Sequence, residues 1–177
     1  MTASREAGGL RPGAGAQRER RIMDAIALFK RCRERRAEIL LLEREEAALD
    51  AAMTGCGGGG GGGVRGTQHD RFAGYMSRKD ALLRREKTLR RLLVAEQVAV
   101  NILTGALPNE KRRDAMRLYW GRGRSAAQVA MEMNYSLRHI ERIVAEDLQL
   151  MGRLDGAEVD AALPGWYLKW ARENRIL

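Results

Sequence analysis

The chain has 177 residues, of which 32 are Lys or Arg and 23 are Asp or Glu, so its formal net charge is +9. This length allows one domain with an extension and excludes two large domains. Two cysteines are too few for a disulfide framework, and the basic balance favours a polyanionic partner. Because no apolar run reaches membrane-spanning length and no signal peptide is evident, we expect a cytoplasmic protein with no membrane partner.

The N-terminal part of the sequence predicts a leader and then a long helix. Residues 1–16 are rich in Gly, Ala and Arg and lack an apolar period, which is typical of a disordered segment. From Gln17 to Met53 there is no Gly or Pro, and helix-forming residues dominate. Its apolar side chains recur at roughly helical spacing: Ile22, Ile26, Phe29, Cys32, Leu40 and Ala47.

A glycine-rich loop, at about 54–71, separates this helix from a second one. Seven consecutive glycines at 57–63 cannot sustain a helix, because glycine loses the most backbone freedom on folding. Ser77, with Asp80 three residues on, resembles a capping box and predicts the start of the second helix, which Gly105 stops. The second helix carries its own apolar series: Leu82, Leu89, Leu93, Val100 and Leu103. Two long helices joined by one loop predict an antiparallel hairpin over 17–105.

Charged residues on the second helix allow more than one interpretation. Glu86 and Glu96 fall at positions where a strict heptad counted from Leu82 requires apolar groups, so we expect the two helices to pair only in part. The basic run 78–91 fits a solvated surface with local ion pairs, and it also fits a second nucleic-acid face.

Residues 108–153 carry the signals of several short, capped helices. Asn109 precedes the segment KRRDAMRLYW, which has an apolar face and ends at Gly121. Ser125 can cap the next helix, with Gln128 at the third position of a capping box. This segment predicts a supporting helix followed by the first helix of a helix-turn-helix.

The second helix of that motif follows after a tight turn. Asn134 is a candidate left-handed C-cap, and Ser136 is an N-cap only two residues later. If Ile140, Ile143 and Val144 face inward, the remaining side chains near the N-terminus of this helix point outward. That end of a recognition helix enters the major groove of DNA.

These positions define the candidate site residues. An arginine can bond the O6 and N7 atoms of guanine together, whereas other basic and hydroxyl side chains contact phosphates. The base-reading candidates are Leu137, Arg138, His139 and Arg142. The phosphate-contacting candidates are Lys111, Arg112, Arg122, Arg124, Ser125, Gln128 and Ser136.

The segment SAAQVAMEMNYSLRHIERIVAEDL resembles the helix-turn-helix of bacterial sigma factor region 4, without gaps. The order of long helix, glycine loop, long helix and RLYWGRGRSAAQVAMEMNYSLRHIERI is similar to that of small phage and prophage proteins, some related to ArpU-type late transcription regulators. The resemblance implies a phage or prophage DNA-binding regulator with Leu137, Arg138 and Arg142 at the positions that touch promoter bases. Since Leu137 and Arg142 replace the polar side chains usual there, we expect a different target sequence.

The C-terminal tail, 154–177, is aromatic, with Trp166, Tyr167 and Trp170 within five residues. It either packs back on the helical core or binds a partner, and we favour packing. His69 and His139 have no cysteine or carboxylate at metal-ligand spacing, so no metal site is predicted. With no catalytic Ser, His and acid arrangement in view, we expect no enzyme activity and no cofactor.

The sequence therefore predicts an all-α protein with a long antiparallel helical hairpin followed by a C-terminal helix-turn-helix bundle. Its favoured function is sequence-specific transcription regulation, with double-stranded DNA as partner and a homo-oligomer, preferably a dimer, as the binding form. RNA polymerase is a further partner that the sigma resemblance implies. A complete sigma factor is not expected, because no region that melts DNA precedes the motif. Two alternatives remain open: a DNA packaging component like a small terminase subunit, and an adaptor that binds polymerase or another protein.

Overall fold

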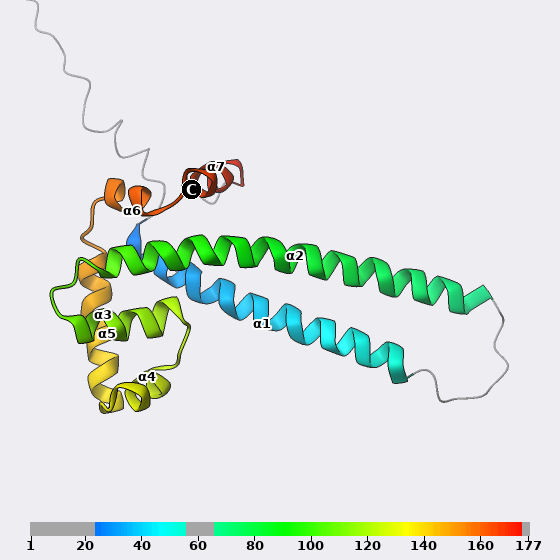
Figure 1. The fold of residues 1–177 in the computed structure, drawn as a ribbon, viewed down its shortest axis with the longest axis horizontal. Coiled ribbons are helices and arrows are strands. Elements are labelled where there is room, and N and C mark those ends of the chain that lie inside the picture. Colours follow the sequence, from blue (N-terminus) through cyan, green and yellow to red (C-terminus); the bar gives the residue numbers. More distant parts are fainter. Residues whose placement is uncertain (1–23, 56–65, 175–177) are drawn as a thin grey trace, which may run out of the picture.

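The computed structural model describes residues 24–55 and 66–174, and every regular element in these ranges is a helix (Figure 1). Two long helices, α1 (Ala25–Gly55) and α2 (Gly66–Thr104), form a hairpin. The elements after it are α3 (Glu110–Met116), the π-helical turn η3 (Arg117–Gly121), α4 (Ala126–Met133), α5 (Leu137–Met151), α6 (Gly156–Ala162) and α7 (Gly165–Glu173). The all-α prediction and the predicted hairpin are confirmed. The predicted leader, 1–16, lies outside the described residues, as do residues 17–23 of the predicted first helix.

Ion pairs between the two long helices show that they run antiparallel. They join Asp50 to Lys79, Glu43 to Arg90 and Arg35 to Glu96. The residue number falls along α1 as it rises along α2, as an antiparallel pair requires. Several side chains of the basic run 78–91 thus face acidic residues of α1, which supports its interpretation as a solvated surface with local ion pairs.

The predicted start of the second helix is wrong. The helix α2 begins at Gly66, so Ser77 lies inside it and caps nothing, and the loop predicted at about 54–71 is too long. The cause is a tertiary contact, because Tyr75 donates a hydrogen bond to Asp50 Oδ1 at 2.7 Å and Lys79 binds the same carboxylate at 2.8 Å. These contacts hold the early turns of α2 against α1. Packing between helices outweighs a local capping pattern in such a case.

The line of contact between α1 and α2, which we call the seam, follows a seven-residue repeat. We had expected from the sequence that this repeat would hold only in part. On α2, Leu89, Leu93 and Val100 are buried, and Glu96 is fully buried among them. On α1 the buried series passes through Ile39 and Leu42, whereas the predicted Leu40 is 50% exposed and the predicted Ala47 is exposed as well. The predicted apolar stripe of α1 was therefore out of register in its second half, because a seven-residue repeat from Cys32 leads to Ile39.

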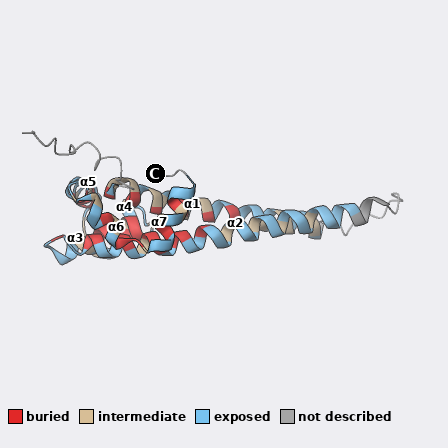
Figure 2. Ribbon diagram, turned by 90° about the horizontal axis from the view of Figure 1, so that it is seen from above, coloured by how far each residue is buried: buried red, intermediate tan, exposed pale blue. Residues whose placement is uncertain are grey.

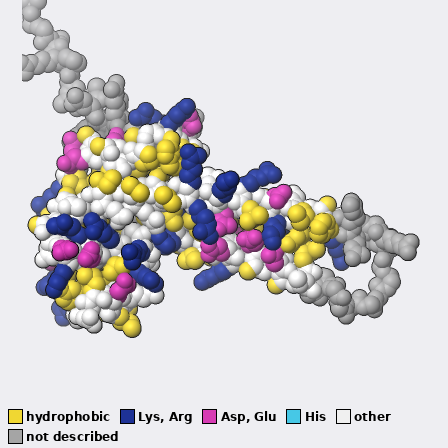
Figure 3. Space-filling view, viewed as in Figure 1, with side chains coloured by type: hydrophobic (Ala, Val, Ile, Leu, Met, Phe, Trp, Pro, Cys, Tyr) yellow, Lys and Arg dark blue, Asp and Glu magenta, His cyan; other side chains and the backbone are white. Residues whose placement is uncertain are grey.

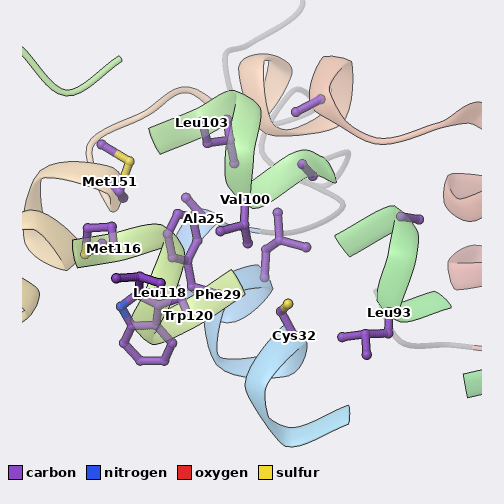
Figure 4. Close-up of a cluster of buried hydrophobic side chains, with 14 of the residues drawn as sticks. Ala25, Phe29, Cys32, Leu93, Val100, Leu103, Met116, Leu118, Trp120 and Met151 are labelled. Carbon is purple, nitrogen blue, oxygen red and sulfur yellow. The ribbon is translucent and has the colours of Figure 1, made fainter. Parts of the chain in front are cut away.

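The base of the hairpin is the centre of the core. The α3–α5 unit packs on one side of it, and α6 and α7 lie on the other (Figure 1). Buried residues gather at this base, and the projecting part of the hairpin is mostly exposed (Figure 2). In the core, the rings of Phe29 and Trp120 meet edge to face at 6.2 Å, with Met116 and Val100 nearby (Figure 4). No described helix has the length and apolar character needed to cross a membrane.

The aromatic tail packs back on the hairpin, as we favoured from the sequence. Tyr167 is fully buried, and its hydroxyl donates a hydrogen bond to Glu96 Oε1 at 2.5 Å. Arg35 approaches the same carboxylate with two hydrogen bonds, each of 2.8 Å. The Arg35 guanidinium also lies 5.6 Å from the centre of the Trp170 ring. A buried ion pair with one added hydrogen bond thus joins α1, α2 and α7.

Candidate nucleic-acid interface

The helix α3 begins at the predicted cap. Asn109 Oδ1 accepts hydrogen bonds from the backbone N–H groups of Lys111, at 2.9 Å, and Arg112, at 3.4 Å. The last turn widens into the π-helical η3, in which the Arg122 N–H donates to the Arg117 carbonyl. The wide turn places Trp120 in the core and leaves Arg122 exposed. Turns of this kind recur at functional sites.

The two helices of the predicted motif have the predicted caps. Ser125 and Gln128 form a reciprocal capping box at the start of α4. Asn134 ends α4 in the left-handed conformation with φ 56°. Two residues later, the Ser136 hydroxyl accepts from the His139 N–H at 3.3 Å and starts α5. The structure therefore contains two short capped helices joined by a tight turn, as a helix-turn-helix requires.

The inward face of α5 is the predicted one. Ile140, Ile143 and Val144 are buried, and α5 packs on both α3 and α4. Leu137 is 46% exposed, and Arg138 and Arg142 are exposed. The first turns of α5 lie beside α4, at the end of the α3–α5 unit that is farther from the hairpin (Figure 1). The N-terminal end of α5 is therefore accessible to a large partner.

The candidate base-reading side chains share one exposed surface. Arg142 Nη2 lies 3.1 Å from His139 Nδ1, and the His139 ring lies 4.8 Å from that of Tyr135. A shallow concavity here is lined by Ser136, Arg138, His139, Glu141 and Arg142. Within the described ranges Arg138 forms no ion pair, whereas Arg142 lies 3.8 Å from Glu146 in an exposed pair, so the Arg138 guanidinium is the freer of the two to donate to a partner. Arginine donors match guanine, and the exposed Glu141 could accept from cytosine.

Most of the predicted phosphate-contacting side chains lie at the ends of α3, α4 and α5 that carry unpaired backbone donors. The hydroxyls of Ser125 and Ser136 accept from the backbone and keep their own hydrogen for donation. Lys111, Arg122 and Arg124 are exposed. Lys and Arg side chains lie over this lobe of the molecule, with some Asp and Glu between them (Figure 3). Helix N-termini together with such side chains are suited to bind phosphate groups.

Arg112 has a different role from the one expected. Its guanidinium pairs with Asp147, which is fully buried, at 2.6 Å and with Glu146 at 2.8 Å. The hydrogen bond that Arg112 donates to Asp147, and the charges of both carboxylates, raise the pKa of Arg112 above its usual value. This contact fastens α3 to α5. These ion pairs occupy donors that Arg112 would otherwise offer to a phosphate.

The structure also brings together residues that the sequence analysis did not select. Arg36 of α1 and Arg117 of η3 lie with Arg122 around one concavity, with Gln97 and Asn101 of α2 on its wall. Because these side chains come from three elements far apart in the chain, no spacing in the sequence points to them. Among the described residues, no cluster of His, Cys, Asp and Glu could hold a metal ion.

Comparisons with protein-family models, with curated proteins and with solved structures find no match for this chain. The assignment of a function therefore depends on the geometry of the α3–α5 unit and on the sequence pattern that predicted it.

Proposed function

We propose that this protein binds duplex DNA in a sequence-specific manner through α5 and regulates transcription, without enzyme activity. The observation that carries the proposal is the pair of capped helices α4 and α5, which presents Arg138 and Arg142 on the exposed N-terminal end of the second helix. A recognition helix enters the major groove by this end. The resemblance of this segment to sigma factor region 4 supports a phage or prophage regulator.

Each part of the unit has a distinct role in this mechanism. Arg138 and Arg142 donate to the edges of guanine bases, and Leu137 makes an apolar contact, for example with a thymine methyl group. Lys111, Arg122 and Arg124, together with the N-termini of α4 and α5, hold the phosphate backbone and fix the register. The Arg112 ion pairs with Asp147 and Glu146 keep α5 at a fixed angle to its supporting helix.

Fluorescence anisotropy with labelled duplexes tests this assignment. Replacing Arg138 and Arg142 by Ala should lower affinity for the preferred site about tenfold or more per arginine, because each loses a bidentate base contact. Affinity for duplexes of random sequence should change far less. Arg124→Gln should instead weaken binding to all duplexes alike and reduce the salt slope by about one.

The control for these variants is Arg84→Gln, because Arg84 is an exposed arginine of the projecting hairpin. It removes the same charge outside the proposed interface. If this variant weakened binding as much as the changes in α5, the helix would have no special role.

A second candidate function is protein binding by the projecting hairpin. Large apolar side chains are exposed on it: Leu40, Leu41, Phe72, Met76 and Leu83. Such a surface suits a second copy of this chain, as in a dimeric regulator or a packaging ring, or a partner such as RNA polymerase. The mass in solution, measured by light scattering, separates a dimer from a ring. Wild-type function in the Arg138→Ala, Arg142→Ala protein would favour the adaptor.

A further inference from the structure

A cluster of arginines lies where the hairpin meets the α3–α5 unit. Arg36 comes from α1, and Arg117 and Arg122 come from the π-helical turn and the residue after it. Together with Gln97, Asn101 and Gly121 they line a concavity of about 560 Å³. This volume falls within the range of small-ligand sites. No carboxylate is among the residues that line it.

The geometry of the cluster is held by the backbone of the turn. The Gly121 carbonyl accepts hydrogen bonds from Arg36 Nη2 at 3.1 Å and from Gln97 Nε2 at 3.0 Å. Gly123, with φ 68°, lies so close to the Arg36 side chain that a Cβ there would be 2.4 Å from Arg36 Cδ. The left-handed backbone and the close approach both require glycine. Arg36 is thus positioned before any ligand binds.

The cluster has more donors and more positive charge than its surroundings satisfy. The buried Nε atoms of Arg36 and Arg117 have no hydrogen-bond partner within the described part of the chain. Two carboxylates lie near the cluster: Asp114 pairs with Arg117 at 3.6 Å in a partly exposed ion pair, and Glu132 lines a neighbouring concavity with Arg117 and Arg122. Arginines stay protonated at any physiological pH, so three positive charges face two nearby carboxylates and the cluster keeps a net positive charge. An anion placed in this concavity would accept hydrogen bonds from these donors.

We propose that this concavity binds a phosphate group through Arg36, Arg117 and Arg122. Guanidinium groups match the tetrahedral oxygens of phosphate with forked hydrogen bonds, and the carboxamides of Gln97 and Asn101 lie on the same wall. Two sources can supply this group: the backbone of bound DNA, or a small phosphorylated molecule. Binding to the DNA backbone rests on the proposed function. Arg122 is one of the predicted phosphate contacts, and it lies three residues before Ser125, which is another. The second source does not depend on DNA binding.

The test for the group itself uses inorganic phosphate and the full-length protein. Arginine Nε–H resonances are followed by NMR during a phosphate titration at constant ionic strength. The signals of Arg36, Arg117 and Arg122 should shift together with one affinity, while that of Arg84 should not move. In Arg117→Gln and Arg122→Gln the affinity should fall about fivefold or more, because each variant loses charge-assisted hydrogen bonds. Neither side chain belongs to the buried core, and circular dichroism checks that the variants fold.

The second arm measures the affinity of the same variants for a duplex of random sequence, with Arg84→Gln as the matched control. If Arg117→Gln weakens duplex binding and reduces the salt slope while Arg84→Gln does not, DNA supplies the phosphate. If phosphate shifts the three arginines and duplex affinity is unchanged, a small phosphorylated molecule is the ligand. Both outcomes support the proposal. It is overturned if phosphate moves none of the three resonances and the variants bind duplex like Arg84→Gln. That result leaves base reading by Arg138 and Arg142 untouched, so the two proposals fail separately.

Discussion

The carboxylate of Glu96 shows how one charged side chain is accommodated in an apolar seam. It is fully buried, and it accepts two hydrogen bonds from Arg35 and one from Tyr167. A buried charge is tolerated only when it is paired and hydrogen-bonded in this way. Burial and the nearby Glu96 charge raise the pKa of Tyr167 well above its usual value, so this phenol stays a donor. The network ties three helices to one point.

Removing one partner of this network should destabilise the protein strongly. Glu96→Gln leaves the Arg35 guanidinium buried without its counter-charge, and we expect a loss of about 3–5 kcal/mol in the free energy of unfolding. Tyr167→Phe should cost about 1–2 kcal/mol, because one hydrogen bond to a charged group is lost. Urea unfolding followed by circular dichroism measures both. The control is Glu43→Gln, which breaks an exposed pair with Arg90 and should cost less than about 1 kcal/mol. Equal losses in Glu96→Gln and Glu43→Gln would contradict the structural role of the network.

Gly123 offers a second test at a single residue. Alanine there must adopt φ 68° and displace Arg36, so Gly123→Ala should lower the free energy of unfolding by about 1–2 kcal/mol. Gly74→Ala is the matched control, because a Cβ at Gly74 meets nothing within 4 Å. That exposed helical position should gain up to about 1 kcal/mol instead. Thermal unfolding of the two variants should move in opposite directions, and a common direction would be against the geometry described for Gly123.

Individual residues differ in how far the sequence predicts them. The caps Asn109, Ser125, Asn134 and Ser136 were predictable, because a cap is a local interaction within a few residues. The partners of Glu96 were not, since Arg35 is 61 residues away and Tyr167 is 71 residues away. The sequence showed only that a charge occupied an apolar position. The role of Arg112 was missed for the same reason.

At the scale of helices, the first half of α1 lies in the core. Its residues Leu28, Phe29 and Cys32 are fully buried beneath α2 and η3. Burial, and next the charge of Glu96, raise the pKa of the Cys32 thiol to about 12. Because the folded protein holds the thiol in its protonated form, the reactive thiolate is nearly absent at pH 8. Cys32 therefore reports on the opening of α1.

Thiol labelling measures this opening. In a Cys56→Ser variant, which leaves Cys32 as the one cysteine, an aromatic disulfide reagent at pH 8 should react about a thousandfold slower than in denaturant. In Glu96→Gln the rate should rise, since the core around α1 opens more often. A rate in the native protein within tenfold of the denatured one would show that α1 is not packed as described.

The helices also show where local sequence signals fail. Both long helices were predicted from composition and apolar spacing, which are strong over many turns. Their ends were less predictable, because α2 extends back to Gly66 through contacts of Tyr75 and Lys79 with Asp50. The apolar stripe predicted on α1 wrongly included Leu40, because the sequence alone does not distinguish an apolar residue beside the contact between the helices from one within it. The residues that are buried, Cys32 and Ile39, are seven apart, as in the repeat of paired helices.

For the whole molecule, the hairpin base is a platform with two covered sides. The α3–α5 unit occupies one side and the tail helices α6 and α7 occupy the other (Figure 1). This arrangement leaves the N-terminal end of α5 exposed, and it leaves most of the projecting part of the hairpin exposed as well (Figure 2). DNA binding at the first and self-association at the second are compatible. If the proposed regulator is a dimer, its two copies of α5 would read two half-sites of one duplex.

The order of these parts could be predicted, whereas their relative placement could not. Helix lengths and caps follow from the local sequence, but the side of the hairpin that each unit covers depends on contacts such as Phe29 with Trp120. The arginine cluster of Arg36, Arg117 and Arg122 exists only because that placement brings α1 to η3. Sites built between elements therefore had no signature in the sequence.

The most direct test of the central claim, that α5 reads DNA, is selection of bound sites from a pool of random duplexes followed by sequencing. The wild-type protein should enrich one short motif containing guanines in neighbouring major-groove positions, and a dimer should enrich it as a repeat. The protein with Arg138→Ala and Arg142→Ala should enrich no motif while still retaining duplex at low salt. Failure of the wild-type protein to enrich any motif, or enrichment of the same motif by the variant, would contradict the account.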